Sequence, residues 1–230
     1  MRRAIIFDVD GVVVDSEPFH MRSIRAVLRK FGVKYTKKEY AKRFAGTGSR
    51  YIISTLLRDY NIRADVGALV RARAALYQRL IEHRRLKTFP GFGAFLRALK
   101  RNKIPIALAS GGHRINVVSS LKAAGLKPSD FPVKITVENV PQRKPHPQIF
   151  LAAAQALRAN PRDCVVIEDS IVGVKAAKRA RMRCVALLTT SAKSDLKQAG
   201  ADLIVKDFRD RRLWRFVGLR AGCGRTAALC

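Results

Sequence analysis

The stretch AIIFDVDGVVVDSE, residues 4–17, decides the fold of this chain. It opens with an apolar run, Ala4 to Phe7, and a short run that is apolar at every position is typical of a strand buried on both faces, as in a parallel sheet. Two carboxylates, Asp8 and Asp10, end the run, and Gly11 then permits a sharp turn. Because side chains two apart on a strand point to the same side, the pattern predicts a buried strand that ends in a paired acidic site.

Five more short apolar runs follow, and helix-like segments separate most of them. The runs cover 104–109, 133–137, 164–167, 184–188 and 202–205. The helix-like segments cover 91–101, 114–124, 146–158 and 171–180. This alternation predicts an α/β fold, a doubly wound, Rossmann-like parallel sheet with helices on both faces.

Residues 17–86 break the alternation. Their apolar residues recur at helical spacing, as in Ile24, Val27 and Leu28, and no strand-like run separates them. We therefore predict an all-helical module inserted after the first strand.

The α/β core is then predicted to consist of residues 1–16 and 87–230. The chain is expected to return to it near Pro90 and Gly91, because proline and glycine interrupt regular structure. The last stretch, 208–230, is predicted to form a final helix followed by a loose tail.

The composition is unusually basic. Among 230 residues, 46 Lys and Arg oppose 17 Asp and Glu, which gives a formal net charge of +29. Such a charge can bind polyanions, so nucleic acid is one candidate partner. The basic residues are dispersed along the chain, however, and this favours a solvated basic surface over a nucleic-acid-binding face.

Other features of the sequence point to a cytoplasmic protein. No apolar stretch is long enough to span a membrane, and the N-terminal apolar run is too short for a signal peptide. The four cysteines form no CxxC pair, so we expect packing roles for Cys164 and Cys184 and no metal role for any cysteine. We expect a monomer.

Several polar motifs coincide with predicted strand ends. Like charges as close as Asp8 and Asp10 need a cation or a shared proton, which suits a magnesium site with one carboxylate free to attack phosphorus. An ordinary Asp-Gly turn fits the motif alone equally well. Glu168-Asp169 forms a second acidic pair at the end of the run 164–167 and could complete an oxygen-rich magnesium shell.

Two motifs could hold a phosphoryl group at the same place. Ser110 and Gly111 follow the run 104–109 directly, where a hydroxyl and free backbone amides form a phosphate cradle, although an ordinary helix cap is the alternative. Lys144, held beside prolines 145 and 147, could offset phosphate charge. Because open α/β sheets bind ligands at the carboxyl ends of their strands, these motifs are predicted to meet at one edge.

With these motifs the chain resembles the haloacid dehalogenase superfamily, in the subgroup that contains β-phosphoglucomutase and small-molecule phosphatases. Residues 8–17 resemble its first motif, Ser110 its second, Lys144 with its prolines its third, and residues 168–170 its fourth. The resemblance implies magnesium-dependent phosphoryl transfer.

The roles follow from the same resemblance. Asp8 would be the nucleophile that becomes an aspartyl phosphate, and Asp10 the general acid and base. Ser110, Gly111 and Lys144 would hold the phosphoryl group. Asp8, the backbone carbonyl of Asp10, Glu168 and Asp169 would hold Mg²⁺.

The helical module 17–86 resembles the mobile cap of this family, which closes over the site and selects the substrate. Within it, Arg50 could contact a substrate anion, and His20 near the hinge could also face the site. One departure lies beside the third motif, where relatives often have glycine and this chain has Arg143.

Three functions remain open at this point. The favoured one is a phosphatase for a small phosphorylated metabolite, such as a sugar phosphate. The nearest alternative is a mutase of the β-phosphoglucomutase type, which shares every core motif, although Ala45 stands where a lysine would have supported it. The third is a basic nucleic-acid-binding protein on the same scaffold.

Overall fold

The computed structural model describes residues 3–44, 46–82 and 85–219. Its centre is a six-stranded sheet in the order β3-β2-β1-β4-β5-β6, in which every neighbouring pair is parallel. The strands are β1 Ala4–Phe7, β2 Ile106–Ala109, β3 Val133–Ile135, β4 Cys164–Glu168, β5 Arg183–Leu187 and β6 Leu203–Val205. The predicted doubly wound parallel sheet is confirmed, and each of its strands overlaps a predicted run.

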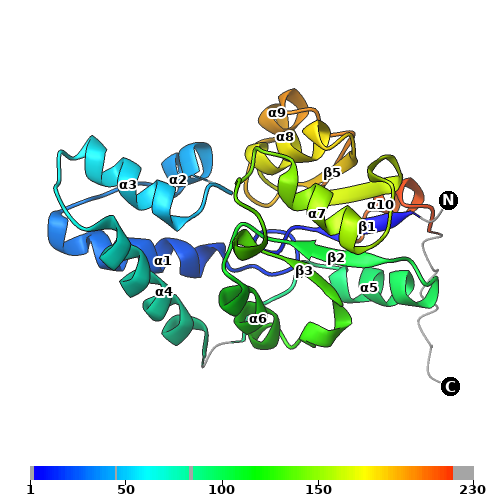
Figure 1. Ribbon diagram of the computed structural model, residues 1–230, viewed down its shortest axis with the longest axis horizontal. Coiled ribbons are helices and arrows are strands. Elements are labelled where there is room, and N and C mark those ends of the chain that lie inside the picture. Colours follow the sequence, from blue (N-terminus) through cyan, green and yellow to red (C-terminus); the bar gives the residue numbers. More distant parts are fainter. Residues whose placement is uncertain (1–2, 45, 83–84, 220–230) are drawn as a thin grey trace, which may run out of the picture.

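Helices cover both faces of the sheet (Figure 1). They are α5 Phe92–Arg101, α6 Arg114–Ala123, α7 Gln148–Ala156, α8 Ile171–Arg179, α9 Lys193–Gln198 and α10 Arg211–Phe216. The side chains of β1 alternate between two hydrophobic clusters, with Ile5 and Phe7 facing α5 and α6, and Ala4 and Ile6 facing α7 and α8. All four are fully buried, which explains why this strand is apolar at every position.

Some element bounds differ from the predicted ones for local reasons. Strand β2 begins at Ile106, after Pro105, which has no N–H to donate to a neighbouring strand. Strand β3 ends at Ile135, because Thr136 caps the short 3₁₀ helix Val137–Asn139. Three other 3₁₀ turns cover Arg29–Phe31, Pro128–Asp130 and Pro161–Asp163.

Among the described residues, four α-helices lie between β1 and α5: α1 Glu17–Leu28, α2 Lys37–Phe44, α3 Ser49–Asp59 and α4 Val66–Glu82. They enclose a hydrophobic cluster of their own that includes Ile24, Phe44 and Ile53. Figure 1 shows them beside the carboxyl edge of the sheet, at the left of the view. Near the C-terminal end of α4, Tyr77 packs into the hydrophobic cluster that Ile5 and Phe7 form with α5 and α6.

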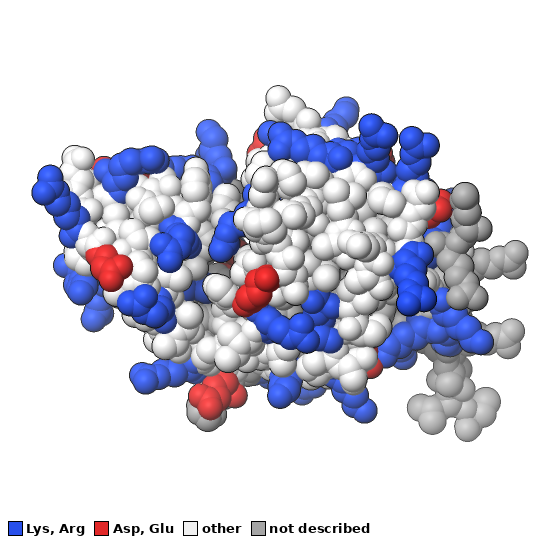
Figure 2. Space-filling view, viewed as in Figure 1, with Lys and Arg blue, Asp and Glu red and all other residues white. Residues whose placement is uncertain are grey.

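At the C-terminus, α10 occupies part of the final helix that was predicted, while the predicted tail beyond residue 219 lies outside the described residues. Cys164 and Cys184 are buried free cysteines, as expected. None of the described helices is long and apolar enough to cross a membrane. Figure 2 shows Lys and Arg side chains spread over the helical module and the sheet region alike on this face.

Candidate active site

The buried ammonium group of Lys144 joins the ends of three strands. Its Nζ donates to Asp8 Oδ1 at 2.5 Å, to Glu168 Oε1 at 2.7 Å and to the carbonyl of Ala109 at 3.1 Å. Asp8 directly follows β1, Glu168 ends β4 and Ala109 ends β2, so three adjacent strands present these groups at one edge. The expected convergence at the carboxyl edge is therefore observed.

The carboxylate of Glu168 is fully engaged by the protein. While Oε1 accepts from Lys144, Oε2 accepts from the backbone N–H groups of Asp169 and Ser170 and from the Ser170 hydroxyl, at 2.8 to 2.9 Å. Gly173 leaves room for it, because a Cβ there would lie 1.8 Å from Oε1. These contacts lower the pKa of Glu168 against the opposing effect of burial.

Asp169 lies against the turn that follows Asp10. Its Oδ2 accepts a hydrogen bond from the Thr190 hydroxyl, while the Thr189 hydroxyl donates to the carbonyl of Gly11 at 2.6 Å. Gly11 has a positive φ of 81°, and a Cβ at this position would lie 1.9 Å from Asp169 Oδ2. Only glycine therefore allows both this turn and the close approach of Asp169.

Asp10 is held by His20 of the helical module and by Ser16, which directly precedes that module. Its Oδ1 accepts from the Ser16 hydroxyl at 2.5 Å and from His20 Nε2 at 2.9 Å. Arg73 of α4 donates to the other ring nitrogen, Nδ1, which leaves Nε2 as the donor to Asp10. The imidazole also stacks on the Tyr77 ring with 4.2 Å between centroids. Burial raises the pKa of Asp10, but His20 and Ser16 overcome that effect and lower it to about 2.

The acidic groups of this site carry more negative charge than Lys144 balances. Burial raises the pKa of Asp8 to about 7, and Glu168 and Asp10 add to this effect while Lys144 opposes it. Burial also raises the pKa of Asp169 well above its ordinary value, again with a contribution from neighbouring carboxylates. A divalent cation would relieve this repulsion.

The donors fit magnesium in part. Among the described residues, no cluster of three or more His, Cys, Asp or Glu side chains is arranged to hold a metal ion. Asp8 and Asp169 both line the cavity and offer carboxylate oxygens, and Mg²⁺ is commonly held by one or two carboxylates together with water. The side chain of Glu168 is instead committed to Lys144 and the backbone, and that of Asp10 to Ser16 and His20.

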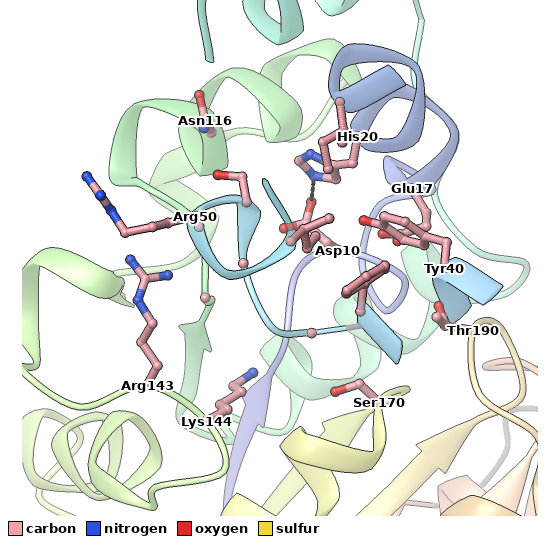
Figure 3. A pocket seen from close by; sticks show the side chains of 18 of the residues that line it. Asp10, Glu17, His20, Tyr40, Arg50, Asn116, Arg143, Lys144, Ser170 and Thr190 are labelled. Carbon is pink, nitrogen blue, oxygen red and sulfur yellow. Dashed lines mark hydrogen bonds and ion pairs between the residues drawn. The ribbon is translucent and has the colours of Figure 1, made fainter. Parts of the chain in front are cut away.

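These groups open on a cavity of about 240 Å³ between the sheet edge and the helical module (Figure 3). The predicted residues that line it are Asp8, Asp10, His20, Arg50, Gly111, Lys144 and Asp169. Ser110 is not among the residues that line the cavity. It is fully buried, and its hydroxyl accepts from the N–H of Gly112 at 3.0 Å.

Further cavity residues were not singled out in the sequence as parts of the site: Glu17, Tyr40, Arg73, Asn116, Arg143 and Thr190. Arg73 could have been identified from the sequence, because it stands among Leu69, Tyr77 and Ile81 at helical spacing. In the structure its side chain is buried, with 5 % exposed. An arginine on the apolar face of a helix is rarely buried without a partner. Oε1 of Glu17 and Nε of Arg73 are buried without a hydrogen-bond partner among the described atoms.

The fold and this cluster define an α/β enzyme with an acidic, lysine-bridged site at the carboxyl edge of its sheet. The family model of the haloacid dehalogenase-like hydrolases matches residues 2–181. The chain belongs to this family, and the enzyme class that its motifs predicted is confirmed.

Similar proteins support the predicted subgroup. The chain is 34 % identical to Protein SUPPRESSOR OF QUENCHING 1, chloroplastic, of Arabidopsis thaliana over 89 % of its own length, but it spans only 19 % of that protein. It is 30 % identical to a phosphorylated carbohydrates phosphatase of Thermotoga maritima, covering 88 % of this chain and 94 % of the relative. The crystal structure of β-phosphoglucomutase from Clostridium difficile superposes with a TM-score of 0.80 at 27 % identity, covering 90 % and 92 % of the two chains.

Proposed function

We propose that this protein is a magnesium-dependent phosphatase that hydrolyses a small phosphorylated metabolite, such as a sugar phosphate, through an aspartyl-phosphate intermediate. The observation that carries the proposal is the buried bridge from Lys144 to Asp8 and Glu168, together with Asp169, whose carboxylate lines the same cavity as Asp8. The similarity to a carbohydrate phosphatase agrees with it.

In the proposed reaction, a carboxylate oxygen of Asp8 attacks phosphorus, the bond to the leaving oxygen breaks, and the metabolite departs as an alcohol. Asp10 gives that oxygen its proton and then takes a proton from the water that hydrolyses the aspartyl phosphate. Inorganic phosphate leaves and Asp8 is restored. With its pKa lowered to about 2, Asp10 is ionised in the free enzyme, so it acquires its proton when an anionic phosphate binds beside it.

Lys144 is placed to offset charge on the nucleophile and on the transferred group. Ser110 and Gly111 are proposed to support the phosphoryl group, with Gly111 in the cavity wall and Ser110 fixing the turn behind it. When bound by Asp8, Asp169 and the Asp10 carbonyl, Mg²⁺ would supply positive charge against the carboxylates and the phosphate.

The helical residues 17–86 are proposed to act as a cap over a core of residues 1–16 and 87–230. His20 and Arg50 bring helical-module side chains to the cavity, so closure would complete the site and exclude water. We further propose that the protein works as a cytoplasmic monomer.

A mutase is the second candidate, favoured by the similarity to β-phosphoglucomutase. In a mutase the aspartyl phosphate passes to a sugar hydroxyl instead of water. Nucleic-acid binding is a weaker third candidate, because the basic residues in Figure 2 are spread out without a single patch on this face.

The test is phosphate release from a panel of sugar phosphates, nucleotides and phosphoglycolate, with and without magnesium, by the wild type and Asp8→Asn. Magnesium-dependent release that Asp8→Asn abolishes would support the phosphatase. Conversion of β-glucose 1-phosphate to glucose 6-phosphate without release would select the mutase, and silence in both assays would count against both.

A further inference from the structure

The six helices that pack on the sheet, α5 to α10, end in the same kind of turn. In each turn a residue just past the helix has a positive φ, and the N–H after that residue donates to the carbonyl five positions back, as Ile104 does to Leu99 at 3.0 Å. Glycine usually fills such a position, because a Cβ there crowds the following carbonyl oxygen.

In this protein the position is filled in two ways. After α6, α9 and α10 it is a glycine: Gly125, Gly200 and Gly218. After α5, α7 and α8 it is a basic residue: Lys103, Arg158 and Arg181, with φ values of 52°, 51° and 58°. In these three turns a basic side chain is therefore present although the backbone conformation disfavours any side chain.

The two kinds of turn lead to different strands. The basic turns precede β2, β4 and β5, whereas Gly125 precedes β3 and Gly200 precedes β6, the two outer strands. Strand β1, between β2 and β4, is itself preceded by Arg3. The four central strands thus all begin beside an exposed basic residue, at the amino edge of the sheet (Figure 1, at the right of the view).

The cations at this edge are left unpaired by the described part of the chain. Arg162, before β4, and Arg183, at the start of β5, join the four already named, and we call the six the amino-edge cations. Within residues 3–44, 46–82 and 85–219, none of them makes an ion pair within 4.0 Å. One acid, Asp163, lies in the same loops and is likewise without an ion pair among these residues.

The outer strands differ in this respect too. Asp130, before β3, pairs with Lys100, and Asp202, before β6, pairs with Lys178. Unpaired positive charge is therefore a property of the four central strand starts.

We propose that the amino edge of the sheet binds the phosphate backbone of a nucleic-acid duplex, DNA or RNA, through the amino-edge cations. The inference goes beyond the proposed function and leaves it intact, because Asp8 lies at the opposite edge. Basic residues that are dispersed along the sequence meet here, since the amino ends of parallel strands share one edge. Neighbouring strands lie about 4.8 Å apart, so the four central starts form a compact row of positive charge.

The composition of this edge selects among polyanions. Proteins that bind single strands stack the bases on aromatic side chains, and proteins that bind membrane surfaces insert apolar ones. In the described part of the chain the large exposed hydrophobic residues all lie outside these loops: Tyr51, Tyr60, Ile115, Leu151 and Leu188. A duplex backbone needs only cations, and arginine donates two parallel hydrogen bonds to a phosphate.

A purely structural explanation of the same cations makes a different prediction. A cation near the C-terminus of a helix interacts favourably with the helix dipole, so replacing it with glycine would lower the melting temperature. If Lys103, Arg158 and Arg181 are instead retained for a ligand, glycine relieves the backbone crowding, and the melting temperature should stay the same or rise.

The test measures fluorescence anisotropy of short labelled DNA and RNA duplexes with 5′-hydroxyl ends, titrated with protein over a range of salt concentrations. One amino-edge variant carries Lys103→Gly, Arg158→Gly and Arg181→Gly, and a second has glutamine at the same three positions. The control variant removes three exposed cations from α2, α3 and α4, so that all variants lose the same charge: Lys42→Gln, Arg58→Gln and Arg71→Gln.

The wild type should bind a duplex with an affinity that falls as salt rises. Both amino-edge variants should bind roughly tenfold or more weakly at low salt, and the slope of log affinity against log salt should become shallower by about three, since each lost phosphate contact removes about one. The control should weaken binding by less than about twofold, because exposed charges far from the contact are screened. Asp8→Asn should bind like the wild type.

The inference fails if the wild type binds neither duplex, or if the control weakens binding as much as the amino-edge variants do. A lower melting temperature of the glycine variant with unchanged binding would assign these cations to the helix ends alone. Sedimentation with anionic lipid vesicles is measured in parallel. Amino-edge variants that lose vesicle binding but keep duplex binding would make a membrane surface the partner and overturn the inference.

Discussion

Lys144 Nζ and Asp8 Oδ1 lie 2.5 Å apart although 136 positions separate the two residues, and the side chains are only 3 % and 11 % exposed. The same ammonium group also pairs with Glu168, so one cation is shared by two buried carboxylates. The proposed chemistry and the folding stability therefore depend on the same contact.

Replacing Lys144 with methionine is expected to lower both the rate of phosphate release and the free energy of unfolding. Removing one member of a buried ionic cluster leaves unpaired charge, which typically destabilises a protein by about 3–5 kcal/mol. Phosphate release should fall to background, because among the described residues no other basic side chain pairs with Asp8. Urea unfolding and the phosphate assay measure the two effects.

Lys178→Met is the matched control, since Lys178 and its partner Asp202 are 34 % and 33 % exposed. An exposed pair contributes about 0–1 kcal/mol, so this variant should remain nearly as stable and as active as the wild type. Equal destabilisation by the two substitutions would contradict the buried network.

Gly173→Ala should destabilise the protein although Gly173 lies in helix α8. Alanine normally favours a helix over glycine by about 1 kcal/mol. Here the new Cβ would meet Glu168 Oε1 at 1.8 Å and displace the carboxylate that Lys144 binds. Gly93→Ala, in the first turn of α5, is the control and should not destabilise the protein, because its Cβ would meet nothing nearer than 3.5 Å. Thermal unfolding of both variants should show a decrease for residue 173 and no decrease for residue 93.

Thr190→Val tests the proposed cation site without relying on turnover. The Thr190 hydroxyl donates to Asp169 Oδ2, and valine keeps the shape while removing that donor. A carboxylate that has lost its orienting partner binds metal less well, with typical losses of about 10-fold to 100-fold. The magnesium concentration that half-saturates the rise in melting temperature should increase accordingly. Ser54→Ala, on the outer face of α3, should leave it unchanged, and an unaltered midpoint in Thr190→Val would argue against cation binding at Asp169.

The sequence was sufficient for the sheet and for the acidic edge because both depend on local patterns. The run before Asp8 is apolar at every position since both faces of β1 are buried, and strand ends in a parallel sheet must share one edge. The partners of Glu168 could not be deduced, because a strand-end carboxylate gives no sign whether an ammonium group or a metal will face it.

Cavity residues from the helical module were the hardest to predict. Arg143 and Arg50 meet at one end of the cavity only because helix α3 is brought beside the loop before Lys144. No spacing within the sequence encodes such a meeting. In a chain with 46 basic residues, a functional arginine also has no distinctive composition around it.

Arg73→Met is expected to separate activity from stability. Arg73 is 5 % exposed, lies 5.0 Å from the centre of the Tyr77 ring and donates to His20 Nδ1. Burial lowers the pKa of Arg73, which indicates that keeping this charge inside the protein costs free energy of folding. Methionine fills similar volume without a charge, so the free energy of unfolding should stay the same or rise.

Activity should nevertheless fall. Without Arg73 the His20 ring can carry its proton on either nitrogen, and in one of these tautomers Nε2 no longer donates to Asp10. Because Asp10 is proposed to handle the proton in both steps, we expect kcat to fall by roughly tenfold or more, with a smaller change in KM. Arg79→Met, on the exposed side of the same helix, should change neither quantity. A large loss of stability in Arg73→Met with an unchanged kcat would mean that Arg73 serves packing alone, and the chain from Arg73 through His20 to Asp10 would then have no part in proton transfer.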